Sequence, residues 1–269
     1  MRIFSFGGGV QSTAALVLAA QGRLQYDAFV FSNVGADSEN PETLAYIEQY
    51  TRPYADAHGL NLIEVQRTRR DGSTDTLVQR LTRTPGFNIP ARFPNGMPGN
   101  RNCTEDFKVL VVDKWLRKQN VTHAIVGLGI SLDEFTRARD TDWHDQHGNG
   151  KKPRRLGFWR KREYPLLDLR LSRQDCFNIV YREGLPVPPK SSCYFCPFKR
   201  AGEWLELKTK RPDLFDKAVA LEKHINDWRV NRGQPPLYMH RFVKPLDEAT
   251  SDQLPLFEDD GCESGYCMT

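Results

Sequence analysis

The residue types best suited to chemistry begin with a glycine turn close to the start of the chain. The stretch reads Ser5, Phe6, Gly7, Gly8, Gly9, Val10, Gln11, Ser12, Thr13. Glycines permit positive φ and close approach of the backbone to a ligand, so successive N–H groups can point at an anion. A helix starting nearby adds the partial positive charge of its N-terminus. The stretch indicates a phosphate cradle, and a plain strand-to-helix turn is the alternative.

Cysteines form the second chemical feature. Cys193 and Cys196 make a CxxC pair, a spacing that lets two thiolates reach one metal from a tight turn. A redox dithiol or two buried cysteines would give the same spacing. Cys176 lies in a helix-like apolar run, which indicates core packing. The remaining cysteines are Cys103, Cys262 and Cys267.

Charge is unevenly distributed along the chain. Residues 151–162, from Lys151 to Arg162, hold seven basic residues in twelve, and residues 245–269 hold seven acidic residues and no Lys or Arg. The basic run includes Phe158 and Trp159, which could stack on a base while the cations neutralise phosphates. It could grip a nucleic acid such as tRNA or DNA, close over a small anionic ligand, or form a solvated face.

Composition indicates a globular protein without a membrane partner. The 269 residues are 39% hydrophobic and 27% charged, with a formal net charge of +4. No stretch reaches the roughly 18 uninterrupted apolar residues of a membrane helix, and we find no signal peptide. We therefore expect a cytoplasmic protein, in which cysteines serve metal or redox chemistry more often than a disulfide framework.

Strand and helix patterns alternate along the first half of the chain. Strands are expected at residues 3–6, 28–31, 60–65 and 124–128, with helices over residues 12–21 and from Glu42 onward. Residues 202–232 predict two helices broken at Arg211 and Pro212. The order predicts an α/β fold with a doubly wound, mainly parallel sheet of about five strands, four of which are the strands named above. Gly7 to Gly9 and Gly35 to Asp37 would lie at carboxyl ends of strands, where ligands bind in such sheets.

Several motifs in this order resemble a known family. Residues 5–13 resemble the PP-loop of the ATP pyrophosphatase superfamily, and the wider pattern is similar to its phosphoadenosine phosphosulfate (PAPS) reductase-like branch. The likeness spans about residues 3–200. Its supporting segments are residues 33–43, residues 101–104 with Lys108, residues 127–134 with Arg137, and residues 192–198.

The resemblance implies a fold, two regions and a nucleotide site. The fold would be adenine nucleotide alpha hydrolase-like, with a PP-loop domain over residues 1–190 and a CxxC-containing helical region and cysteine tail over residues 191–269. ATP or a sulfonucleotide would bind, with Mg²⁺. The implied nucleotide-binding residues are Ser5, Gly7, Gly8, Gly9, Val10, Gln11, Ser12, Thr13, Gly35, Lys108, Gly127, Asp133 and Arg137.

Gln11 stands where many PP-loops carry an aspartate. It lacks a carboxylate for Mg²⁺ or for phosphate orientation, so Asp37, Glu39 or Asp133 would have to supply one. We expect Gln11 and Asp37 to take part in catalysis.

The resemblance also implies a metal centre bound by Cys103, Cys193 and Cys196. A [4Fe–4S] cluster is expected, with Zn²⁺ as the alternative. In one interpretation Cys262 or Cys267 supplies a fourth ligand. In a second interpretation, three cysteines leave one iron open, and the tail thiols act as catalytic nucleophiles or persulfide carriers. In a third interpretation, the tail thiols have no role.

Three functions remain open on this basis. The first is ATP-dependent sulfur transfer to tRNA or DNA, with adenylation of the acceptor and a sulfur-donor protein as partner. The second is reduction of PAPS or its non-phosphorylated relative (APS), in which a tail cysteine attacks sulfur. The third is an inactive nucleotide-binding accessory subunit, with which Gln11 would be consistent.

Overall fold

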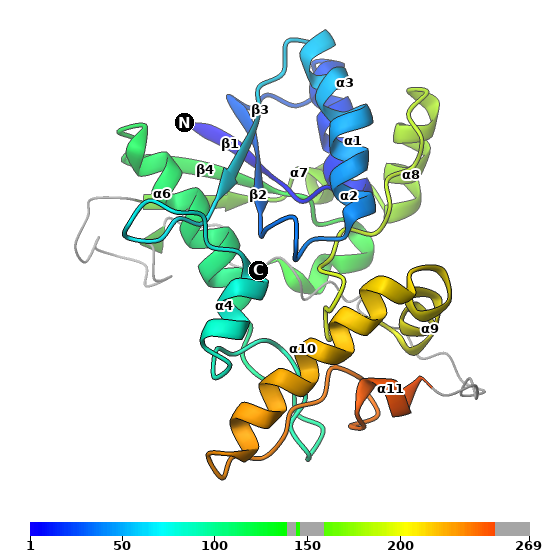
Figure 1. The fold of residues 1–269 in the computed structure, drawn as a ribbon. Coiled ribbons are helices and arrows are strands. Elements are labelled where there is room, and N and C mark those ends of the chain that lie inside the picture. Colours follow the sequence, from blue (N-terminus) through cyan, green and yellow to red (C-terminus); the bar gives the residue numbers. More distant parts are fainter. Residues whose placement is uncertain (139–143, 146–158, 251–269) are drawn as a thin grey trace.

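A computed structural model describes residues 1–138, 144–145 and 159–250 of the chain (Figure 1). Its centre is one sheet with strand order β3-β2-β1-β4-β6-β5. Within the described part of the chain, no helix is long and apolar enough to cross a membrane.

Five of the strands are parallel, as the sequence predicts. The central strand β1 (Arg2–Phe6) pairs with β2 (Ala28–Asn33) and β4 (His123–Leu128), and β3 (Leu62–Gln66) extends the sheet beyond β2. Beyond β4 lies β6 (Trp159–Glu163). A sixth, two-residue strand, β5 (His144–Asp145), pairs antiparallel at that edge.

The fifth parallel strand corrects one expectation. Trp159 to Arg162 end the basic run that we expected to contact an anionic ligand or to form a solvated face, yet they form most of β6. Arg160 is buried there, and its Nη1 lies 2.9 Å from Asp113 Oδ2 on the neighbouring helix. This arginine therefore stabilises the sheet edge instead of facing a polyanion. Residues 151–158 lie outside the described residues.

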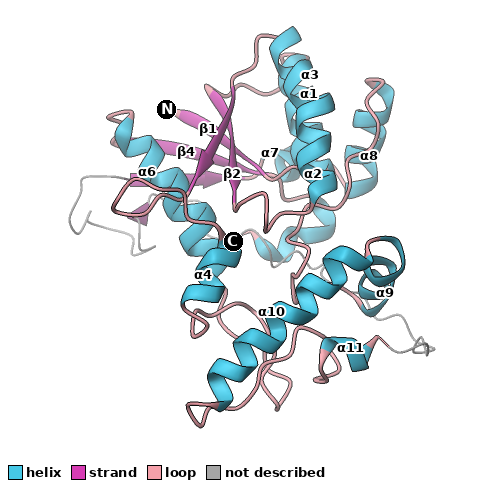
Figure 2. Ribbon diagram, in the orientation of Figure 1, coloured by secondary structure: helices cyan, strands magenta, loops and turns pink. Residues whose placement is uncertain are grey.

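Helices cover both faces of the sheet, which makes the fold doubly wound (Figure 2). Successive side chains of a strand point to opposite faces. Phe4 and Phe29 accordingly pack on the face covered by α1 (Val10–Ala20) and α8 (Arg173–Arg182). Ile3 and Val30 pack on the other face, against α6 (Leu110–Lys118). Shorter elements complete these layers: α2 (Pro41–Tyr46), η1 (Ile47–Thr51), α3 (Arg52–Ala57), α5 (Asn102–Thr104), η2 (Glu105–Val109), η3 (Leu132–Arg137) and α7 (Pro165–Asp168).

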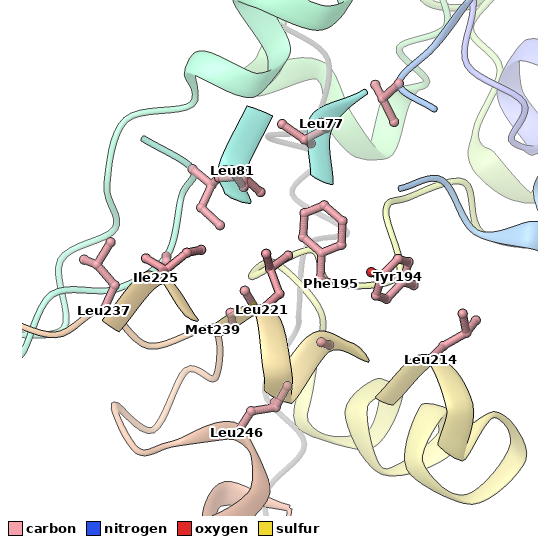
Figure 3. Close-up of a cluster of buried hydrophobic side chains, with 14 of the residues drawn as sticks. Leu77, Leu81, Tyr194, Phe195, Leu214, Leu221, Ile225, Leu237, Met239 and Leu246 are labelled. Atoms are coloured by element: carbon pink, nitrogen blue, oxygen red, sulfur yellow. The ribbon is translucent and has the colours of Figure 1, made fainter. Parts of the chain in front are cut away.

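A helical region packs beside the sheet and has a core of its own (Figures 1 and 3). It contains α4 (Leu77–Arg83), α9 (Ala201–Lys210), α10 (Pro212–Val230) and α11 (Leu246–Ala249). The break between α9 and α10 falls at Arg211 and Pro212, as predicted. Leu77 and Leu81 share this core with Phe195 and Leu221, so residues on both sides of the expected boundary at residue 190 build it together.

The carboxylate of Glu222 on α10 anchors the segment that follows that helix. Its Oε1 accepts a hydrogen bond from the Met239 backbone N at 2.6 Å, and its Oε2 accepts one from the Leu246 N at 2.7 Å. Burial raises the pKa of Glu222 to about 7, even though both backbone donors lower it. The folded protein therefore favours the neutral acid more than the unfolded chain does.

This raised pKa predicts a pH dependence of stability. Between about pH 4.5 and pH 7 the folded state binds more protons at Glu222 than the unfolded state, so the free energy of unfolding falls as pH rises. Each unit of pKa difference is worth about 1.4 kcal/mol. We expect denaturant unfolding of the wild type and of Glu222→Gln to show a stability difference that changes across this window. Curves that stay parallel from pH 4.5 to 7 would contradict the assignment.

Candidate functional site

A cavity of about 390 Å³ opens at the carboxyl ends of the central strands. Gly7 follows β1, Val34 follows β2 and Gly129 follows β4, and all three residues line it. Ligands of open parallel sheets bind at this edge. Further lining residues come from α1, η2, η3, α8 and residues 187–199.

The glycine turn presents the N-terminus of α1 to this cavity. Gly8 has φ of +76°, and the turn is held by Ser12 Oγ, which donates to the Gly9 carbonyl at 2.9 Å and accepts from the Gly9 N at 3.1 Å. The first N–H groups of a helix have no acceptor within it. Val10, Gln11 and Ser12 carry those groups and line the cavity, so the turn is built to meet an anion.

The segment that carries the CxxC pair is attached to the strand ends by backbone contacts. Ser191 Oγ donates a hydrogen bond to the Gly7 carbonyl. The Asn40 N donates to the Ser192 carbonyl at 3.2 Å, and the Tyr194 N donates to the Ser38 carbonyl at 3.3 Å. The CxxC turn is thereby placed beside the glycine turn, although about 180 residues separate them in the sequence.

Three cysteines predicted as metal ligands line this one cavity. Cys103 reaches it from α5, and Cys193 and Cys196 from the CxxC turn; all three are half-buried. In the described residues, no three His, Cys, Asp or Glu side chains converge closely enough to hold a metal ion. Cys262 and Cys267, the tail thiols expected as ligands or nucleophiles, lie outside the described residues.

Cys176 has a different role. It is fully buried between α8 and α1, and burial raises the pKa of its thiol to about 12. A thiol that does not ionise is a poor nucleophile and a poor metal ligand. The structure therefore confirms Cys176 as a core residue.

The cavity is strongly basic. Six cationic side chains line it, whereas Glu134 is the sole carboxylate among its described lining residues. Lys190 is engaged by Glu203, whose Oε1 lies 2.8 Å from its Nζ. The excess of positive charge would raise the local concentration of an anionic ligand. The six cations are Arg101, Lys108, Arg137, Arg173, Lys190 and Lys199.

Arg137 is the most informative of these cations because it is 7% exposed. One arm of its guanidinium donates to Glu134, and burial raises the pKa of that carboxyl although Arg137 favours its charged form. Its Nε is buried and has no hydrogen-bond partner in the described part of the chain. A buried donor left unsatisfied costs about 1–3 kcal/mol. An anion bound in the cavity would supply the missing acceptor.

The predicted nucleotide-binding residues divide into two groups. Those that line the cavity are Gly7, Gly9, Val10, Gln11, Ser12, Lys108 and Arg137. Those that the cavity lining does not include are Ser5, Gly8, Thr13, Gly35, Gly127 and Asp133.

Two of the three carboxylates expected to hold Mg²⁺ are occupied by other contacts, and the third, Glu39, is buried and does not line the cavity. Asp37 accepts hydrogen bonds from Ser38 Oγ and Thr76 Oγ1, both at 2.8 Å, and does not line the cavity. Asp133 accepts from the Arg173 N and so caps the start of α8. Both side chains support loops around the site in this structure.

Sequence reasoning missed much of the cavity wall. Arg101, Arg173 and Phe177 line it, as do residues 187–191 immediately before the CxxC pair. Arg101 lies within the supporting segment of residues 101–104, so its position near the candidate ligand Cys103 was a usable signal. Arg173 and Phe177 gave none, because their helix reaches the site only through tertiary packing.

Comparisons with known proteins were made for the sequence and for the fold. No family model matches the chain. No curated protein matches it by sequence. One similar solved structure is the U34-tRNA thiolase NcsA of Methanococcus maripaludis with its [4Fe–4S] cluster, at 12% identity and a TM-score of 0.43, covering 83% of this chain and 71% of that one. Likeness at this level assigns no activity or ligand to the chain.

Two glycines with similar backbone angles test the geometry of the turn. Gly8 and Gly22 have φ of +76° and +73°, so an alanine is strained at either position by roughly 1–2 kcal/mol. A Cβ on Gly8 would also lie 2.8 Å from Thr43 Cγ2, whereas one on Gly22 meets nothing within 4 Å. We expect Gly8→Ala to lower the melting temperature more than Gly22→Ala does. Equal shifts would mean that the space around Gly8 is not as described.

Proposed function

We propose that this chain is a PP-loop enzyme that transfers sulfur to a nucleic acid in an ATP-dependent reaction. The observation that carries the proposal is the joint placement of an open helix N-terminus, six basic side chains and three thiols around one cavity. The first two features suit the phosphates of a nucleotide, and the thiols suit sulfur chemistry.

The nucleotide phosphates would lie on the first turn of α1. N–H groups of Val10, Gln11 and Ser12 would donate to them, and Lys108 and Arg137 would add charge-assisted hydrogen bonds. Preorganised donors of this kind stabilise charge that develops in the transition state. The Nε of Arg137 would gain its acceptor at the same time.

The reaction that we propose has two bond exchanges. An oxygen of the acceptor attacks the α-phosphorus of ATP, an O–P bond forms, and the bond to pyrophosphate breaks. Sulfide, as HS⁻ from the sulfur donor, then attacks the activated carbon. A C–S bond forms, the C–O bond breaks, and AMP leaves with the oxygen. The donors at the glycine turn would stabilise the charge on the departing pyrophosphate.

Cys103, Cys193 and Cys196 would hold an iron–sulfur cluster at the cavity wall. The donors fit in kind, because clusters are held by cysteine thiolates. A single Zn²⁺ needs ligand sulfurs that converge within about 2.3 Å of one point, and the described residues offer no such group of three. A bound cluster would supply a site for the sulfur atom. Cys262 or Cys267 would act as a fourth ligand or as the thiol that carries sulfur.

Reduction of a sulfonucleotide is the second candidate, and one observation favours it. Glu134, the sole carboxylate on the described cavity lining, is already paired with Arg137. Transfer from a sulfonucleotide involves no adenylation, so it depends less on a carboxylate-bound Mg²⁺. An accessory subunit that binds nucleotide without turnover is the remaining alternative, consistent with Gln11.

Product analysis distinguishes these functions. We expect AMP and pyrophosphate to form from ATP only when tRNA or DNA is added, and Gly8→Ala to reduce the rate at least tenfold because its turn cannot hold the same shape. Gly22→Ala, which has a matched backbone angle far from the cavity, should retain the rate. Sulfite release from PAPS or APS with a thiol donor would favour the reductase instead. ATP binding with neither product would indicate the accessory role.

Metal analysis tests the cysteine assignment independently of turnover. Anaerobically purified wild type should contain about four irons with acid-labile sulfide and absorb in the visible range. Cys193→Ala should lose this iron, and Cys176→Ala, the matched core variant, should keep it. A chain cut after Asp260 shows whether the tail supplies a ligand. Unchanged iron in Cys193→Ala would overturn the assignment, and one zinc per chain would favour a structural centre.

A further inference from the structure

One face of α8 exposes two aromatic side chains to solvent. Phe177 is 40% exposed and Tyr181 is 71% exposed, whereas Cys176 and Val180 on the same helix are buried against α1. Residues four apart lie one above the other on a helix, so Phe177 and Tyr181 share a row with Arg173. These rings contribute little to the protein core and are available to a ligand.

This row begins at the cavity. Both Arg173 and Phe177 line it, and Tyr181 lies one turn farther along α8. The start of the helix is fixed by two contacts, Ser172 Oγ with the Asp175 carboxylate at 2.6 Å and the Arg173 N with Asp133. The row is therefore a rigid extension of the site. We call Arg173, Phe177 and Tyr181 the α8 row.

The surroundings of the α8 row are basic and polar. Arg170 and Arg182 are exposed at its two ends, and Gln174 and Asn178 lie between, joined by a 3.2 Å hydrogen bond. The neighbouring carboxylates are engaged elsewhere: Asp175 caps the helix, and Glu183 accepts hydrogen bonds from Gln21 and Tyr54. Aromatic rings set among arginines and amides suit a polyanion with flat bases better than an apolar peptide.

We infer that the α8 row binds unpaired nucleotides of a single-stranded nucleic acid. Bases stack on Phe177 and Tyr181, which suits any sequence because every base has a π face. Arg173 and Arg182 contact the phosphates. The inference rests on the proposed function, because it identifies how the acceptor approaches: a strand held on α8 leads directly into the cavity that holds the thiols.

A binding measurement tests this inference. A labelled oligouridine of about 12 nucleotides is titrated with the full chain in the absence of ATP, and fluorescence anisotropy reports the affinity. Tyr181→Ser and Phe177→Ser should each weaken binding about tenfold, the effect of losing one stacked base. Tyr181→Phe should restore the affinity. The control is Tyr50→Ser, because Tyr50 is 40% exposed like Phe177 but does not line the cavity.

Salt dependence provides a second readout. Each phosphate contact on a single strand contributes about 0.7 to the slope of log affinity against log salt. Arg182→Gln should reduce that slope by this amount, and a duplex of the same length should bind more weakly than the single strand. An unchanged slope together with unchanged affinity in Tyr181→Ser would overturn the inference.

The outcomes separate this inference from the proposed function. Nucleic-acid-dependent AMP formation with no effect of Tyr181→Ser on oligouridine affinity would reject the α8 row and leave the function standing. Stacking-dependent affinity without AMP formation would do the reverse. Loss of self-association in Tyr181→Ser, with oligouridine affinity retained, would assign the face to a second copy of the chain. If removal of residues 251–269 raises the oligouridine affinity and Tyr181→Ser leaves it unchanged, the exposed face of α8 would be assigned to the acidic tail.

Discussion

The site depends above all on how residues 186–194 are fastened across the ends of β1 and β2. Ser191 contacts the Gly7 carbonyl, the Ser192 carbonyl accepts from Asn40, and the Tyr46 hydroxyl donates to the Pro186 carbonyl at 2.6 Å. These contacts pair backbone groups of the crossing segment with groups at the strand ends and on α2, which favours the crossing. They also bring the CxxC turn to the glycine turn. Without this crossing, the glycine turn and the thiols would belong to separate parts of the molecule.

The electrostatics of the cavity follow from that arrangement. The segments η2 and η3 contribute Lys108 and Arg137, and Lys190 comes from the crossing segment. Lys199 follows the CxxC turn. Arg137 can remain charged in a nearly buried position because Glu134 lies against it, and this pair still leaves one donor unsatisfied. A buried pair of this kind is poor support for stability. The presence of this buried pair is better explained by an anion that it would bind, since the open N-terminus of α1 faces the same cavity.

Local patterns in the sequence predict the features that depend on neighbouring residues. The glycine turn, the CxxC pair and the break at Pro212 can each be recognised from a few neighbouring residues, and Cys176 is buried as expected. Features that depend on distant partners were not predictable. Strand β6 was not predicted because its sequence is rich in basic residues. Arg160 can be buried there only because it pairs with Asp113, which is distant in the sequence. Arg173 reaches the cavity only because Asp133, 40 residues earlier, fixes the start of its helix.

The positions of the carboxylates constrain the chemistry most closely. Gln11 lines the cavity without a charge, and Asp37 is held by Ser38 and Thr76 away from the cavity lining. Under the proposed function, charge neutralisation at the phosphates would then come mainly from the cations and from the N-terminus of α1, because no free carboxylate on the described lining is available to hold Mg²⁺. Arginine and lysine can fill that role, since they stabilise phosphate charge directly. Under the proposed function, these fixed cations would therefore bind the phosphates, and any Mg²⁺ would be held mainly by the nucleotide itself.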